Sequence, residues 1–160
     1  MMGEVVRLRR AELSDAPQIL IWESTAEARS VTCSDQIPTL EFIGHHILSS
    51  NNLVEDSQIR FIIERSDGVP IGTLDLYNYN PTRKCAEVGI FICADMRRQG
   101  YGAETLQKAA EWARDEGLEY LTAEIQTTNN ASRALFAAAG FELAESTCLQ
   151  SIISATLPLK

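Results

Sequence analysis

The stretch FICADMRRQGYGAETLQKAAEWA, residues 91–113, connects an apolar run to a helical pattern through a turn with two arginines and two glycines. The first N–H groups of a helix have no acceptor inside it, and they lie at the positive end of the helix dipole. A glycine-rich turn at this point predicts a phosphate-binding loop; an ordinary tight turn is the alternative. Apolar residues at helical spacing predict the helix itself, namely Leu106, Ala109, Ala110 and Ala113.

Two familiar phosphate-binding motifs do not fit this turn. A Walker P-loop requires Gly-Lys followed by Ser or Thr, and the chain contains no such triplet. A dinucleotide fingerprint requires a third Gly or Ala, but Thr105 stands there, after Gly100 and Gly102. A small nucleotide-binding module therefore stays a minor alternative.

The rest of the pattern predicts one mixed α/β domain over residues 1–160. Asp67-Gly68 predicts a two-residue hairpin turn, and the apolar run at 86–92 predicts a strand in the middle of its sheet. Leu40, Ile43 and Ile47 predict one buried helix face. The predicted strands are 4–12, two within 58–77, 86–92, 118–126, 140–144 and 148–157. The predicted helices are 14–29, 40–50, one that ends before Gly117, and 130–140. Loops are expected at 30–39 and 78–84.

Composition and charge narrow the class of protein. Apolar residues make up 45% of the 160 residues, and the formal net charge is −8. Surplus negative charge argues against nucleic-acid binding and favours a cationic partner, unless it serves solubility alone. Cysteines 33, 85, 93 and 148 lack C-x-x-C spacing, so we expect reduced thiols and no metal. No apolar run approaches about 20 residues and the start lacks a signal-peptide pattern, so we expect no membrane contact and a cytoplasmic location.

The turn belongs to a larger pattern. Arg97-Arg98-Gln99-Gly100-Tyr101-Gly102 resembles the R/Q-x-x-G-x-G/A motif of the GNAT (GCN-related N-acetyltransferase) superfamily. Asn129, Ser132 and Phe136, followed by Gly140-Phe141, resemble a second block of that superfamily. The predicted element order matches the GNAT fold over nearly the whole chain, and AEVGIFI looks most like the ribosomal-protein and spermidine N-acetyltransferase branch. The resemblance implies a mixed, mostly antiparallel sheet of about seven strands with flanking helices, splayed between the fourth and fifth predicted strands.

The resemblance also implies acetyl-CoA as the acetyl donor. Residues Arg97, Arg98, Gln99, Gly100, Tyr101 and Gly102 would bind its pyrophosphate. The main chain of Ile90, Phe91 and Ile92 would pair with the pantetheine arm, with an N–H near Ile92 as oxyanion donor; core packing is the alternative role. Asn129 would contact the cofactor arm or, alternatively, cap the following helix.

The implied chemistry is direct acyl transfer from a thioester to an amine in a ternary complex. An alkylamine is mostly protonated at neutral pH, so a carboxylate has to accept a proton, directly or through water. Glu87 and Glu124 match positions that relatives use in this way, and each could instead be a solvated carboxylate. We expect the reaction to avoid an acetyl-cysteine, because Cys93 has no identifiable base.

One residue departs from the family. Many members carry a tyrosine that protonates the leaving thiolate, whereas this chain has Phe136 at the matching position. Tyr77, Tyr79 or Cys93 are candidate substitutes. The departure also allows a second function, a catalytically weak or inactive acyl-CoA sensor of the same fold.

The acceptor site is expected between the loop at 30–40 and the turn at 77–84. Its candidate residues are Asp35, Tyr77, Asn78 and Tyr79, which could bind an ammonium group by hydrogen bonds and cation–π contact or could be solvated loop residues. The expected acceptor is a small-molecule amine or a peptide N-terminus. A homodimer is a family-level expectation.

Overall fold

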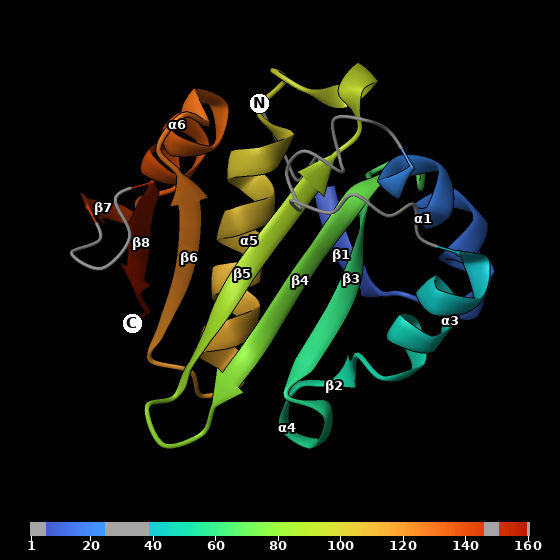
Figure 1. The fold of residues 1–160 in the computed structure, drawn as a ribbon, viewed down its shortest axis with the longest axis horizontal. Coiled ribbons are helices and arrows are strands. Elements are labelled where there is room, and N and C mark those ends of the chain that lie inside the picture. Colours follow the sequence, from blue (N-terminus) through green and yellow to red (C-terminus); the bar gives the residue numbers. More distant parts are fainter. Residues whose placement is uncertain (1–5, 25–38, 146–150, 160) are drawn as a thin grey trace.

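The computed structural model describes residues 6–24, 39–145 and 151–159, which form a mixed α/β fold with helices on both faces of an eight-stranded sheet (Figure 1). The strands are β1 (Val6–Arg10), β2 (Asn51–Asn52), β3 (Gln58–Arg65), β4 (Pro70–Asn80), β5 (Cys85–Ile92), β6 (Tyr120–Gln126), β7 (Glu142–Glu145) and β8 (Ile152–Pro158). The helices are α1 (Ala16–Glu23), α3 (Leu40–Leu48), α4 (Leu53–Asp56), α5 (Tyr101–Asp115) and α6 (Asn130–Ala138), with short 3₁₀ turns at Leu13–Asp15 and Ala94–Met96.

The strand order is β1-β3-β4-β5-β6-β8-β7, with the short β2 added beside β3. Every neighbouring pair is antiparallel except β5 and β6, which run parallel. The predicted central position of the strand at 86–92 is confirmed, because β5 lies between β4 and β6. The expected sheet of about seven strands gains β2, whose two residues show no strand pattern in the sequence.

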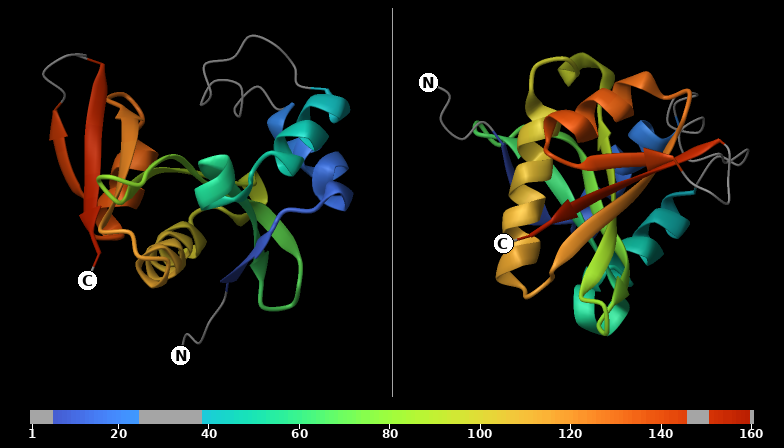
Figure 2. Two further views of the ribbon diagram at one scale, coloured as in Figure 1. Left: turned by 90° about the horizontal axis from the view of Figure 1, so that it is seen from below. Right: turned by 90° about the vertical axis from the view of Figure 1, so that its left-hand side faces the viewer.

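Helices cover the sheet from two sides, as Figure 2 shows. On one face, Leu106, Ala109 and Ala113 of α5 are fully buried against apolar side chains of β3 to β6. On the other face, α1 and α3 pack over Ile62 of β3 with their own apolar residues Ile19, Trp22, Ile43 and Ile47. Full burial of a Leu or Ile side chain contributes roughly 1.5–3 kcal/mol, so these two layers hold the sheet between them.

Two local predictions differ from the structure. Leu40 is 48% exposed, because it is the first residue of α3 and the buried face starts at Ile43. The connection after β3 spans residues 66–69 instead of the two residues Asp67-Gly68. Gly68 adopts φ +88° and its N–H donates to the Arg65 carbonyl at 2.8 Å, so a longer turn closes the hairpin.

Two findings concern membrane-spanning helices and metal sites among the described residues. None of the described helices is long and apolar enough to cross a membrane. Within the same residues no three His, Cys, Asp or Glu side chains gather as a metal site. Cys85 and Cys93 are free thiols, and residues 33 and 148 lie outside the described part.

The contact between α5 and α6 depends on Gly102. A Cβ atom at this position would lie 2.8 Å from Cδ1 of Leu135 on α6, closer than carbon atoms normally approach. The absent side chain therefore lets α6 approach the first turn of α5, which brings the segment after β6 next to the glycine-rich turn.

An ion cluster fastens the edge strand β1 to its neighbours. Glu64 of β3 accepts hydrogen bonds from Arg7 Nε at 3.0 Å and Arg9 Nε at 2.6 Å, and Arg9 also binds both oxygens of Asp15 at 2.8 Å. Burial acts to raise the pKa of Glu64, but the hydrogen bonds from Arg9 and Arg7 outweigh it and hold the pKa below its usual 4.5. The charged form of Glu64 thus stabilises the folded state.

This cluster predicts a pH-dependent stability. A carboxyl whose pKa is lowered by folding contributes stability that is complete above its unfolded pKa, and that is lost as the pH falls through the folded pKa. Glu64→Gln is expected to lower the free energy of unfolding by about 1–2 kcal/mol at pH 7. The difference from wild type should shrink as the pH falls below 4.5. Urea unfolding across pH 7 to 3 measures it, with the exposed Glu142→Gln of β7 as control; a difference independent of pH would contradict the prediction.

The packing of Gly102 predicts a specific coupling. Gly102→Ala should destabilise the protein by about 1 kcal/mol through overpacking against Leu135, and Leu135→Ala should remove that penalty in the double variant. Gly44→Ala in α3 is the matched control, because its new Cβ would lie at an ordinary 3.5 Å from Leu13. Thermal unfolding of the wild type, the two single variants and the double variant measures the coupling. Additive effects of Gly102→Ala and Leu135→Ala would contradict the prediction.

Candidate functional site

The sheet opens between β5 and β6. The parallel ladder contains only the pairs Cys85–Tyr120, Ala86–Leu121 and Glu87–Thr122, although β5 continues to Ile92 and β6 to Gln126. Beyond these three pairs each strand remains paired on its other side, β5 with β4 and β6 with β8. The two halves of the sheet therefore separate beyond the pair Glu87–Thr122, and Figure 1 shows β5 and β6 diverging from each other.

The open edge of β5 exposes main-chain groups of alternate residues. Cys93 N–H donates to the Ile71 carbonyl of β4 at 2.8 Å, so by antiparallel alternation Phe91 faces β4 and Ile90 and Ile92 face the opening. The Ile92 carbonyl, directed away from β4, accepts a bond from Arg97 Nε at 2.7 Å. Of the three residues expected to pair with a ligand, Ile90 and Ile92 present their N–H groups at the open edge, and Phe91 does not.

The glycine-rich turn lies beside this opening, at the start of α5. Gly100 is the N-cap with φ +85°, and no side chain caps the helix. The Glu104 N–H donates to the Gly100 carbonyl, so the N–H groups of residues 100–103 come before the first helical bond and have no acceptor within the helix. Arg98 is also left-handed at φ +62°. The turn presents a row of N–H donors at the positive end of a 15-residue helix.

Arg97 and Gln99 hold the turn from within. The Arg97 guanidinium lies 5.4 Å from the centre of the Phe91 ring while it bonds the Ile92 carbonyl. Burial lowers the pKa of Arg97. Gln99 Nε2 donates to the Asp95 carbonyl at 3.1 Å. Phe91 thus contacts the glycine-rich turn through its ring, whereas the sequence predicted that its main chain would pair with a ligand.

The three residues Tyr77, Glu87 and Glu124 share one face of the sheet at the opening. Tyr77 lies directly opposite Glu87, and Glu87 is opposite Thr122, two residues before Glu124. Directly opposed residues and residues two apart point to the same side. Burial raises the pKa of Tyr77 to about 12, and the carboxylates of Glu87, Glu124 and Asp75 add to the rise. A protonated phenol and two carboxylates therefore face the same region from both sides of the opening.

A bulge in β4 separates Tyr77 from Tyr79. Between the pairs Tyr77–Glu87 and Asn80–Cys85, β4 has two residues and β5 has one, and Asn78 is left-handed at φ +51°. The extra residue sends Tyr79 to the α5 side of the sheet, where it packs on the main core. The Asn78 side chain instead donates to Glu87 Oε2 at 2.7 Å.

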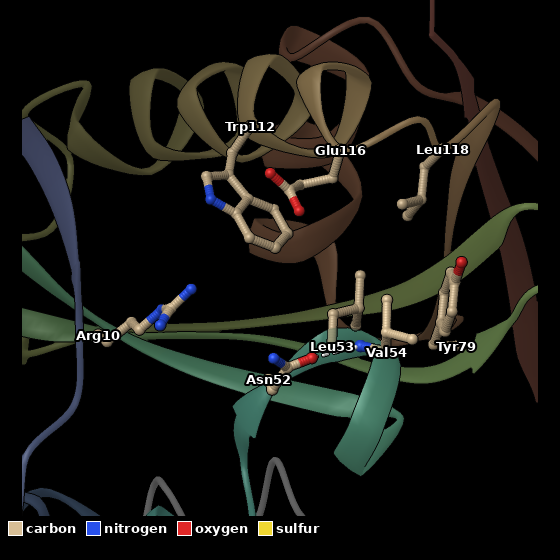
Figure 3. Close-up of a pocket in the computed structure, with 8 residues that line it drawn as sticks. All are labelled: Arg10, Asn52, Leu53, Val54, Tyr79, Trp112, Glu116 and Leu118. Carbon is tan, nitrogen blue, oxygen red and sulfur yellow. Dashed lines mark hydrogen bonds between the residues drawn. The ribbon is translucent and has the colours of Figure 1, made fainter.

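Tyr79 lines a different, small cavity of about 50 Å³ between α5 and the β2–α4 segment (Figure 3). Trp112 and Glu116 of α5 face it from above, and Asn52, Leu53 and Val54 lie below. The structure does not bring Tyr79 together with Tyr77, and Asp35 lies outside the described residues.

Two residues of the second sequence block have clear structural positions. Asn129 is the N-cap of α6, and its side chain accepts the Ser132 N–H at 3.1 Å. Phe136 is buried in the core, with its ring 4.9 Å from Phe141 in an edge-to-face contact. The aromatic ring at 136 thus has a packing role that needs no hydroxyl group.

The sequence interpretation missed a buried ion network on the face of the sheet that carries Tyr77, Glu87 and Glu124. Arg60 is 7% exposed and binds both oxygens of Asp75, at 2.7 and 3.0 Å, and Glu23 of α1 at 3.0 Å. Burial lowers the pKa of the neighbouring His46, and the Arg60 charge adds to the effect. The sequence signal for this network is a charged residue between apolar neighbours in each strand, Arg60 in IRF and Asp75 in LDL.

Comparison with known proteins identifies the family. The model of the acetyltransferase (GNAT) domain matches residues 6–142, which is most of the chain. No curated protein matches the sequence.

Solved structures share the fold at low identity. A spermidine N-acetyltransferase from Vibrio cholerae, solved with CoA and spermine, is 17% identical with a TM-score of 0.83 over 98% of this chain and 96% of that one. An acetyltransferase from Salmonella typhimurium that modifies the N-terminal serine of a ribosomal protein is 18% identical, with a TM-score of 0.82 over 99% and 97%. These structures include spermidine and ribosomal-protein N-acetyltransferases, the branch that the sequence suggested. With its open β5 edge, its glycine-capped α5 and the matching domain model, the chain belongs to the GNAT family of acetyltransferases.

Proposed function

We propose that this protein is an acetyl-CoA-dependent N-acetyltransferase that acetylates a primary amine of a small molecule or peptide by direct attack in a ternary complex. The observation that carries the proposal is the opening of the sheet after Glu87 beside the uncapped start of α5. The proposal is supported by main-chain donors at the open edge of β5, by the positive end of α5 and by Glu87 and Glu124 on one face of the sheet beside them. The solved relatives act on spermidine and on a protein N-terminus, which supports an amine acceptor of either kind.

The site residues fit the expected donor. The N–H groups of residues 100–103 suit a pyrophosphate, because they are free of helical acceptors at a positive helix end. Ile90 and the N–H of Ile92 suit the amides of an extended pantetheine arm. Bound acetyl-CoA supplies an activated acetyl group as a thioester. The Ile92 N–H would then stabilise negative charge on the acetyl oxygen, and Asn129, already fixed as the α6 cap, would border the arm.

Glu87 is the better candidate for the base. It is half-buried and held by a hydrogen bond, whereas Glu124 is exposed. A positioned carboxylate accepts the proton of the incoming ammonium group efficiently because its orientation is set before reaction. Glu124, on the other side of the opening, would add negative charge that attracts the cationic acceptor.

The thiol and phenol groups near the site support direct transfer. Burial raises the pKa of the Cys93 thiol, which disfavours the thiolate that an acetyl-cysteine route requires. Tyr77, with its pKa of about 12, stays protonated but is a weak acid towards a leaving thiolate. Phe136 offers no proton, and this favours the second candidate function, an acyl-CoA sensor with little turnover.

Binding and turnover together test the proposal. Isothermal titration calorimetry should give micromolar, near 1:1 binding of acetyl-CoA and none of ATP or NAD. A panel of polyamines, peptides and other small amines should then include an acceptor that is turned over. Binding without turnover of any amine would favour the sensor, and a folded protein that does not bind acetyl-CoA would refute both functions.

With an acceptor in hand, the two glutamates can be separated. Glu87→Gln should lower kcat by roughly 10²–10⁴-fold, the usual range for loss of a general base, with little change in the affinity for acetyl-CoA. Glu124→Gln should change kcat by less than about tenfold and mainly raise the acceptor KM. The reverse order of the two effects would assign the base to Glu124.

A further inference from the structure

We infer that Asn78 is a positioning residue of the transfer site, whose side-chain amide orients the Glu87 carboxylate from the bulge of β4. The inference rests on the proposed role of Glu87 as the base. Asn78 itself touches neither reacting group and acts through Glu87.

The backbone at Asn78 decides which side chains reach the site. Without the extra residue, strand alternation would direct Asn78 into the α5 side and Tyr79 to the face of Tyr77. The left-handed conformation at φ +51° reverses both directions. Asparagine is among the few non-glycine residues that adopt this conformation readily. A glycine would also fit the backbone there but would offer no donor to Glu87.

The chemistry of the contact suits a base. Asn78 Nδ2 donates to one oxygen, Glu87 Oε2, at 2.7 Å, and leaves Oε1 available to an incoming amine. The donor is neutral, so it brings no positive charge next to Glu87. Asp75 on the same strand shows the contrast, because Arg60 binds both of its oxygens and neutralises it. The Asn78 contact thus fixes the orientation of Glu87 and leaves one of its oxygens unused, which suits proton transfer.

The substitution Asn78→Gly separates the effect of the side-chain amide from the effect of the backbone conformation. Glycine tolerates positive φ, so the bulge is retained while the donor is lost. Ser57→Gly is the matched control, because Ser57 is also a left-handed, exposed non-glycine residue, at φ +62° at the end of α4. We expect Asn78→Gly to lower kcat by about tenfold, with both KM values within about twofold, and Ser57→Gly to leave all three unchanged.

A double-mutant cycle shows whether Asn78 acts through Glu87. In the Glu87→Gln background, Asn78→Gly should change the remaining kcat by less than about twofold. An equal loss in both backgrounds, or full activity of Asn78→Gly, would overturn the inference while leaving the proposed acetyl transfer intact.

A measurement without turnover tests the contact itself. The side-chain amide signal of Asn78, assigned as the one lost in Asn78→Gly, should shift upfield in the proton–nitrogen NMR spectrum of Glu87→Gln, because a carboxylate is the stronger acceptor. A signal that does not move would overturn the inference. Failure of every amine to react would refute the proposed function. In that case, a shifted Asn78 amide signal would still show that the contact between Asn78 and Glu87 exists, although it would not serve acetyl transfer.

Discussion

The short β5–β6 ladder is the constraint on which the site depends. After Glu87–Thr122, β5 follows β4 and β6 follows β8, because each strand has a complete antiparallel partner on its outer side. Parallel pairing is slightly weaker per residue than antiparallel pairing, so this is the contact that gives way. The helix α5 packs beneath both halves and keeps them from separating further. A fully paired sheet would hide the N–H groups of Ile90 and Ile92 and leave no space for a ligand between the strands.

The helix start and the open edge work as one unit because several local contacts join them. Arg97 bonds the Ile92 carbonyl and lies over Phe91, which ties the turn to the end of β5. Gly102 admits Leu135, which brings α6 and its cap Asn129 to the other side of the turn. The glycine motif therefore combines two physical requirements: a positive φ at Gly100 and a close helix contact at Gly102. A ligand that binds the turn would meet β5, α5 and α6 together.

Neighbouring carboxylates of this sheet face differ through their partners. Asp75 and Glu23 are bound by the buried guanidinium of Arg60, and breaking such a buried pair is strongly destabilising. Glu87 accepts a hydrogen bond from the neutral amide of Asn78. The ion network therefore links α1 to β3 and β4, whereas Glu87 at the opening is held by a neutral group. Burial raises the pKa of Tyr77, and the carboxylates of Glu87, Glu124 and Asp75 add to the rise.

The sequence by itself determined the order of the main helices and strands, the position of the glycine-rich turn and the family, because these depend on local periodicity, turn residues and a contiguous motif. It did not reveal β2 and α4, the length of the turn after β3, the exposure of Leu40 or the Arg60 network. Only the tertiary structure decided which candidate residues meet. Strand register placed Tyr77, Glu87 and Glu124 on one face, and one left-handed residue, Asn78, sent Tyr79 to the other. Register and bulges arise from pairing between strands far apart in the chain, and a local pattern carries no record of that pairing.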